Sequence, residues 1–194
     1  MGLHLPDLTK TPKLRSFVDA MGLLLQSDPV ESRVMQQGKA LLGQLIQHDD
    51  WLPEAFSIVN PERYQQFLLY VDPKETFSVV SFVWGPGQAT PIHNHTVWGL
   101  VGVLRGCEQS QAYRFNSLGE CVPDGPSVLM HPGDVDCVSP LAGDIHAVSN
   151  AHRDGVSISI HVYGANIGKV RRNVFREDGS AKEFISGYSN LLVD

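Results

Sequence analysis

The sequence predicts a mainly β protein, a sandwich or a barrel closed on itself, that follows two or three N-terminal helices. Apolar residues recur at helical spacing before residue 50, and short β-rich runs alternate with Gly and Pro turns from residue 64 onward. About eight strands at such spacing are typical of a closed or double-layered β fold. A length of 194 residues with 42% hydrophobic content suits one core. We therefore expect a single domain over 1–194, with a helical segment (1–60) packed on a barrel core (61–175) and a C-terminal extension (176–194).

The first helix is expected over residues 12–26, where one stripe is apolar. The stripe contains Leu14, Phe17, Val18, Met21, Leu24 and Leu25. A second helix should begin near Glu31 and run to about Gln47. Asp28 is expected to cap it, with Pro29 in the first turn and Glu31 completing a capping-box-like pair. A short third helix is expected after Asp50.

The strands are expected in eight β-rich runs separated by turn signals such as Asp72-Pro73, Gly85-Pro86-Gly87 and Pro132-Gly133-Asp134. The runs span residues 64–71, 77–84, 97–104, 107–114, 127–130, 135–139, 144–149 and 156–163. From Gly164 onward the pattern is less regular, and we expect loops with one more strand or helix.

Composition limits the partners. The net charge is −6, from 15 basic and 21 acidic residues scattered along the chain, so no cationic patch suits a nucleic acid. No run reaches ~18 apolar residues, and the N-terminus lacks the apolar core of a secretory signal. We expect a soluble cytoplasmic protein with no membrane contact.

The three cysteines, Cys107, Cys121 and Cys137, are odd in number and widely spaced, so we expect three buried free thiols.

The strongest local signal is Pro91-Ile92-His93-Asn94-His95. Residues two apart on an extended chain project to the same face, so both imidazoles can reach one ion. Alone, this pattern is more often a polar strand edge than a metal site. A second segment, Pro140 to Asn150, contains a further histidine, His146.

The two segments together resemble the cupin family. The first cupin motif has Gly, five residues and His-x-His, with a later Gly, and here Gly87, His93, His95 and Gly106 match it. The second has Pro, Gly, His and Asn, and Pro140, Gly143, His146 and Asn150 follow it with one extra residue. The resemblance implies a jelly-roll barrel with one metal ion on His93, His95 and His146.

One departure from the cupin pattern concerns Gly99, which stands four residues after His95, where many cupins carry a metal-binding Glu. With only neutral imidazoles the ion keeps its full charge and up to three open positions, which favours a directly bound anionic substrate beside oxygen. Imidazoles suit Fe, Zn, Cu and Ni alike, so the ligands do not select the metal.

The run from Val156 to Tyr163 places Ser159, His161 and Tyr163 on one face by strand alternation. Inside a barrel these polar groups would have to hydrogen-bond one another, as a relay. The pattern alone does not decide whether this face points inward or to solvent.

Ser-x-His-x-Tyr beside three cupin histidines and no motif-one Glu resembles the thiol dioxygenases, which include cysteine dioxygenase and 3-mercaptopropionate dioxygenase. The resemblance covers roughly Tyr64 to Arg172. It implies Fe(II) as cofactor, a small thiol and O2 as substrates, and a sulfinate as product. It also implies that Ser159, His161 and Tyr163 form the catalytic relay.

The substrate-binding residues are expected to differ from those of enzymes that act on cysteine. Where those carry a carboxylate-binding Arg, this chain has Gln66, or Gln65 if the register shifts by one. This resembles the bacterial 3-mercaptopropionate dioxygenases, in which a later Arg holds the carboxylate, and Arg172 is the candidate. The segment after His95 has no Cys, so Tyr163 is expected to be unmodified. Trp98 is either at the cavity mouth or an ordinary core aromatic.

Other functions remain open at this stage. The resemblance to the thiol dioxygenases implies 3-mercaptopropionate as the preferred thiol, with cysteine or cysteamine as alternatives. A cupin isomerase, a carbon-bond dioxygenase and a non-enzymatic metal- or ligand-binding cupin are further alternatives, although the first two more often keep the missing Glu. His152-Arg153-Asp154 is expected to be a surface turn, because no phosphate-binding loop accompanies it. Whether the chain forms a homo-oligomer is also open.

Overall fold

The structure, a computed structural model, describes residues 2–190 and 192–193. Its helices and turns are α1 (Pro12–Gln26), α2 (Glu31–Leu45), and the 3₁₀ turns η1 (Glu54–Phe56) and η2 (Ile167–Lys169). Its strands are β1 (Gly2–Leu3), β2 (Gln65–Val71), β3 (Ser78–Trp84), β4 (Ile92–His93), β5 (Gly99–Arg105), β6 (Glu108–Phe115), β7 (Cys121–Pro123), β8 (Val128–Met130), β9 (Val135–Val138), β10 (His146–Asn150), β11 (Ser157–Tyr163), β12 (Arg172–Phe175), β13 (Ala181–Phe184) and β14 (Leu192–Val193).

The two helices form where the apolar stripes predict them. Helix α1 has the predicted bounds, with Pro12 in its first turn, and α2 ends two residues before Gln47. The predicted cap of α2 is wrong. Asp28 lies three residues before the helix with φ 46°, and Val30 occupies the N-cap position without a side-chain hydrogen bond. The third helix is the single turn η1.

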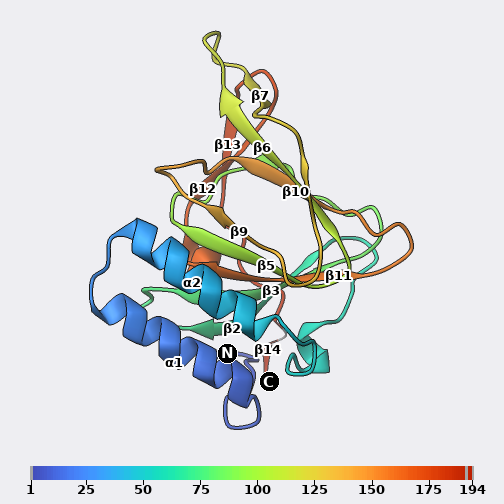
Figure 1. The fold of residues 1–194 in the computed structure, drawn as a ribbon. Coiled ribbons are helices and arrows are strands. Elements are labelled where there is room, and N and C mark those ends of the chain that lie inside the picture. Colours follow the sequence, from blue (N-terminus) through green and yellow to red (C-terminus); the bar gives the residue numbers. More distant parts are fainter. Residues whose placement is uncertain (1, 191, 194) are drawn as a thin grey trace.

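A five-stranded antiparallel sheet, ordered β2-β3-β11-β5-β9, carries the helices on its outer face (Figure 1). Apolar side chains of β2, β3, β5 and β11 pack there against α1 and α2, among them Val83, Leu100 and Ile160. At Gly102 a Cβ atom would stand 2.8 Å from Ile46 Cδ1. The absence of a side chain at Gly102 is what lets the end of α2 approach β5 so closely.

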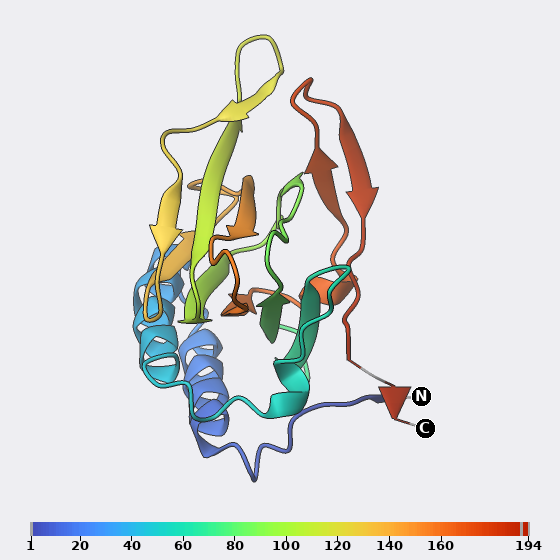
Figure 2. The ribbon, with the colours of Figure 1, turned by 90° about the vertical axis from the view of Figure 1, so that its right-hand side faces the viewer.

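The second sheet is ordered β13-β12-β4-β10-β6-β7, with β8 paired to β6. It faces the first sheet (Figure 2). A smaller cluster of buried residues includes Leu68, Phe82, Val148 and Tyr163. Two facing antiparallel sheets joined by crossover connections make a jelly-roll arrangement. All ladders among the described strands lie within one sheet or the other, or in the β1-β14 pair, so closure of a barrel stays a prediction.

All eight predicted strands are present, with bounds that differ by one or two residues. The irregular C-terminal stretch contains β12 and β13, which pair with each other and extend the second sheet through β4. The short β7 had no signal in the sequence.

Among the described residues no helix is long and apolar enough to span a membrane. The three cysteines are free, but only Cys121 is buried, and Cys107 and Cys137 are half-buried.

Candidate metal centre

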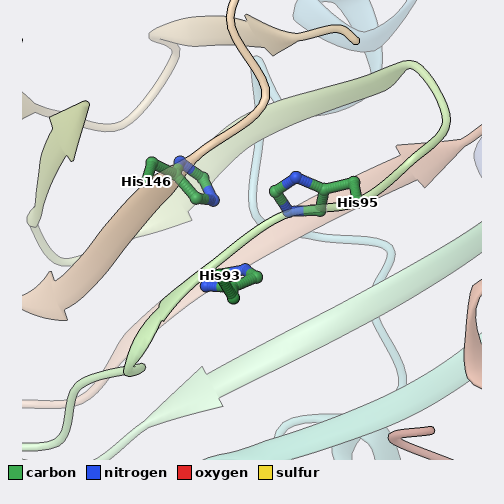
Figure 3. A group of neighbouring side chains, drawn as sticks. All are labelled: His93, His95 and His146. Carbon is green, nitrogen blue, oxygen red and sulfur yellow. The ribbon is translucent and has the colours of Figure 1, made fainter. Parts of the chain in front are cut away.

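Three histidine rings meet in the second sheet because β4 lies between β10 and β12. His93 pairs with His146 across the β4-β10 ladder, and the extended chain places His95 beside them. The ring centroids are 4.8 to 4.9 Å apart, and one nitrogen of each ring lies within 4.8 Å of the others. Figure 3 shows the rings gathered around one point. The predicted metal ligands are therefore together.

Each ring is oriented by a neighbour at its Nδ1 atom. Nδ1 of His93 lies 3.0 Å from the Pro91 carbonyl oxygen, and Nδ1 of His95 lies 3.0 Å from Asp144 Oδ1. Nδ1 of His146 has the Ser110 hydroxyl at 3.5 Å. With Nδ1–H donating outward, Nε2 of each ring is left for an ion.

The fit to a metal is tested by His95, whose ring is buried and whose Nε2 has no partner among the described residues. A buried polar atom without a partner is costly, and a cation at the shared point would satisfy it. Burial lowers the pKa of His93 to about 3, and lowers that of His146 well below its usual value. Neutral imidazoles are the form that binds metals. The donor set fits a metal ion.

A fourth protein ligand is missing from this group of three histidines among the described residues. At Gly99 a Cβ atom would lie 2.8 Å from Val138 Cγ2 and 2.9 Å from Tyr163 Cδ1. The Tyr163 ring thus takes the space that a longer side chain at Gly99 would need. Three imidazoles leave coordination positions for other molecules.

The polar face of β11 points inward, which decides the question that alternation left open. Ser159 Oγ lies 2.8 Å from His161 Nε2, and His161 Nδ1 lies 2.8 Å from the Tyr163 hydroxyl. All three side chains are buried, and the Tyr163 ring stacks on His95 at 5.5 Å. Burial raises the pKa of Tyr163 above its usual value, so the phenol keeps its proton. The relay connects the histidine group to the interior between the sheets.

A cavity of about 230 Å³ opens beside His93 and Tyr163. Gln66 and Arg172 both line it, whereas Gln65 points to the other side of β2 and donates to the Arg63 carbonyl. Gln66 is therefore the glutamine that lines the cavity, and its contact with a substrate stays a prediction. The Arg172 side chain is 4% exposed, donates to the Ser186 hydroxyl at 2.7 Å and covers the Phe184 ring.

The Arg172 guanidinium forms no salt bridge with a described acidic residue, and its Nε has no hydrogen-bond partner. Burial lowers the pKa of Arg172, although an arginine keeps its charge. A buried positive charge without a counterion favours an anion in the same cavity.

Sequence reasoning missed the residues that support the site. Asp144 lies at His95 Nδ1 and also accepts a hydrogen bond from the Thr96 backbone N–H. Its position two residues before His146 was the only signal in the sequence that pointed to it. Ser110, which contacts His146, and Trp84, which donates to Ser159, come from other strands and had no such signal. Trp98 packs, partly buried, against the helix-side core, which is the second of its two expected roles. The Asn150 side-chain amide donates to the carbonyls of Trp84, Gly85 and Gly155. Residues 152–154 are exposed and lie at a bend over 153–155.

No known protein-family model matches the chain. Solved structures that resemble it include cupin-superfamily proteins. An uncharacterized protein with a double-stranded β-helix domain from Klebsiella pneumoniae is 15% identical with a TM-score of 0.48, over 62% of this chain and 88% of that one. A cupin superfamily protein from Desulfitobacterium hafniense is 16% identical with a TM-score of 0.45, over 61% and 94%. An oxalate oxidase in complex with glycolate is 15% identical with a TM-score of 0.42, over 55% and 53%.

Proposed function

We propose that the protein is a non-haem iron thiol dioxygenase that converts a small thiol carboxylate, with 3-mercaptopropionate preferred, and O2 into the sulfinic acid. The observation that carries the proposal is the cavity in which His93 and Tyr163 face a buried, unpaired Arg172. A carboxylate on the guanidinium would compensate that charge.

The three histidines would hold the ion through Nε2. The chemistry that Fe(II) supplies when bound is a positive charge that favours thiolate over thiol, and redox reactivity toward O2. The choice of iron follows the family resemblance, because the imidazole set alone also suits zinc, copper and nickel.

The remaining cavity residues bind and orient the substrate. Arg172 pairs with the substrate carboxylate. Gln66 offers a neutral amide at the position where enzymes that act on cysteine carry an arginine, so a different thiol acid is preferred. Tyr163 holds its proton at the phenol oxygen, from which it can donate to a group beside His93. The aromatic rings of Tyr64 and Phe82 line the same cavity and exclude water from it.

The test is oxygen uptake by anaerobically iron-loaded protein offered 3-mercaptopropionate, cysteine and cysteamine in parallel, with metal content measured on the same sample. Sulfinate formed fastest from 3-mercaptopropionate would support both the reaction and the role of Gln66. Faster turnover of cysteine would contradict the substrate preference and keep the reaction. Absence of thiol-dependent uptake at full iron occupancy would rule out the thiol dioxygenase and leave a metal-binding jelly roll of another activity.

A further inference from the structure

The 186–190 segment, which follows β13, runs along β2, the edge strand of the five-stranded sheet (Figure 2). The Ser189 N–H donates to the Gln66 carbonyl at 2.7 Å, and the Gln66 N–H donates to Ser189 Oγ at 2.9 Å. Asn190 repeats the pattern at Leu68, whose N–H donates to Asn190 Oδ1 at 2.6 Å and whose carbonyl accepts from Asn190 Nδ2 at 3.0 Å. Backbone groups on a sheet edge need such partners. The segment therefore fixes β2 at Gln66, a residue of the candidate cavity.

The same segment is attached to η2, the turn that connects the relay strand β11 to β12. The Gly187 N–H donates to the Gly168 carbonyl at 3.1 Å, and the Gly168 N–H donates to the Tyr188 hydroxyl oxygen at 2.9 Å. The Tyr188 hydroxyl in turn donates to Asn166 Oδ1 at 2.5 Å. These contacts hold the segment in place relative to the start of β12, where Arg172 lies.

The Ser186 side chain meets Arg172 directly. Arg172 Nη2 donates to Ser186 Oγ at 2.7 Å, and Arg172 Cζ lies 4.7 Å from the centroid of the Phe184 ring, the last residue of β13. One contact acts at the edge of the guanidinium and the other on its face, so together they define the plane of the group. Arg172 Nε has no partner among the described residues. Ser186 thus uses one donor of the guanidinium and leaves others for a ligand in the cavity.

Both predicted substrate-binding residues therefore contact one short segment. Gln66 lies in the first sheet and Arg172 in the second, and no ladder among the described strands joins β2 to β12. The segment bridges them, at Gln66 through Ser189 and at Arg172 through Ser186. Residues 186–189 also line a second cavity of about 420 Å³, which shares Tyr64 and Gln66 with the candidate cavity. The segment is thus part of the wall around the substrate-binding residues.

We propose that the 186–190 segment is the specificity-determining element of the carboxylate site, with Ser186 as the residue that positions Arg172. By directing the guanidinium, Ser186 sets the distance between the bound carboxylate and the three histidines. That distance selects the length of the thiol acid that reaches both. The choice of a thiol acid as ligand rests on the proposed function, whereas the positioning of the guanidinium does not.

The positioning role of Ser186 can be separated from the support of the fold. Among the described residues the Ser186 hydroxyl has one hydrogen-bond partner, Arg172, whereas Ser189 and Asn190 hold backbone groups of β2. Ser186 is half-buried, so Ser186→Ala should fold, and Ser186→Thr keeps a hydroxyl at the same position. Ser117, in an exposed turn, provides the control Ser117→Ala.

The first measurement is the rotation of the Arg172 guanidinium, read from its Nε–H and Nη–H signals by NMR of the full ¹⁵N-labelled chain loaded with Zn(II). The Arg172 signals are assigned by their absence in Arg172→Met. We expect separate, narrow Nη–H signals in the parent, in Ser186→Thr and in Ser117→Ala, because the hydrogen bond hinders rotation about the Nε–Cζ bond. In Ser186→Ala these signals should merge.

The second measurement is the affinity of the Zn(II)-loaded protein for mercaptoacetate, 3-mercaptopropionate and 4-mercaptobutyrate, by calorimetry without oxygen. Zn(II) has no redox chemistry, so binding is observed apart from turnover. We expect Ser186→Ala to bind 3-mercaptopropionate about 3–10-fold more weakly and to discriminate less between the three lengths. Ser186→Thr should restore both properties, and Ser117→Ala should keep them. Urea unfolding is measured on the same variants.

The outcomes separate the proposal from its alternatives. Unchanged Arg172 signals in Ser186→Ala would overturn it, and a loss of stability in that variant would then make Ser186 a structural residue. Merged signals with unchanged selection among the thiol acids would overturn the specificity role. Merged signals with weaker binding, in a protein whose iron-loaded form shows no thiol-dependent oxygen uptake, would rule out the dioxygenase and keep the positioning role. Uptake with unchanged Arg172 signals would do the opposite.

Discussion

At the scale of single residues, the site contains buried polar and charged groups that the described residues pair only in part. Among the described residues, His95 has no hydrogen-bond partner at Nε2, and Arg172 has no acidic counterion. Both atoms are enclosed, so solvent offers little compensation. A cation would bind at His95 Nε2, and an anion would bind at the Arg172 guanidinium.

Asp144→Asn is expected to lower metal affinity about 10–100-fold, because the carboxylate orients His95 and raises its basicity. The single amide oxygen can still accept one of the two backbone hydrogen bonds, from His95 or Thr96, so the fold should be retained. Competition with a chelator measures the affinity. Asp154→Asn, in an exposed bend, is the control and should bind metal as the parent does. Equal affinity in both variants would contradict the role of Asp144.

Arg172→Met separates a binding role from a structural one. Replacing a buried unpaired charge with an apolar side chain is neutral or stabilising by about 1–4 kcal/mol. Loss of the carboxylate partner should cost about 2–5 kcal/mol of binding free energy, seen as a higher KM for the thiol acid. Urea unfolding and steady-state kinetics measure the two effects. The exposed control Arg171→Met should keep the parent KM, and a destabilised Arg172→Met with unchanged KM would make Arg172 structural.

At the scale of elements, the close packing of α2 on the outer face of β5 holds the five-stranded sheet that carries the relay. A Cβ atom at Gly102 would stand 2.8 Å from Ile46 Cδ1 and 3.1 Å from Leu42 Cδ2. The opposite face of the same sheet presents Ser159, His161 and Tyr163 to the site. Helix packing and relay geometry are thus coupled through one layer of backbone.

Gly102→Ala should destabilise the protein by about 1–3 kcal/mol, because the new Cβ atom would overlap buried Ile46 and Leu42 side chains. Gly22→Ala in α1 makes the same chemical change where no atom lies within 4 Å, and should stabilise by about 0.5–1 kcal/mol through helix propensity. Urea unfolding measures both. Stabilisation by Gly102→Ala would show that α2 can move away from β5.

At the scale of the whole molecule, the buried histidines make folding depend on pH. The unfolded chain takes up protons near the ordinary histidine pKa of 6.5, whereas folded His93 does so only at about 3, and His146 and His161 also stay neutral. Below 6.5 the unfolded state therefore binds more protons, and the free energy of unfolding falls as pH falls. Each histidine contributes about 1.4 kcal/mol per pH unit in this window.

The metal-free protein is accordingly expected to lose stability as the pH falls from about 6.5 toward 4.5. Glu108 acts in the opposite direction between its unfolded pKa of 4.5 and its folded value of about 7, but one carboxyl group offsets only one of three histidines. Urea unfolding at successive pH values measures the net slope. Stability that is flat or rises on acidification would contradict neutral buried imidazoles.

Several parts of the fold could be predicted from the sequence because they depend on local pattern. The apolar stripe from Leu14 to Leu24 defines α1, and β-rich runs between Gly and Pro turns define eight strands. Asp28 shows the limit of such local signals. Its side chain suits a helix cap, but the chain between the helices bends at φ 46° and begins α2 three residues later.

His93, His95 and His146 could be identified from motif spacing, because residues two apart on a strand share a face and the second motif supplies the third ring. The sequence by itself also determined which residues of β11 alternate together. Only the tertiary structure decided that this face points inward, that Gln66 and not Gln65 lines the cavity, and that Asp144 and Ser110 lie at the Nδ1 atoms of His95 and His146. The physical reason is that strand pairings between distant segments decide where a strand face points and which residues contact it. Local periodicity does not encode these pairings.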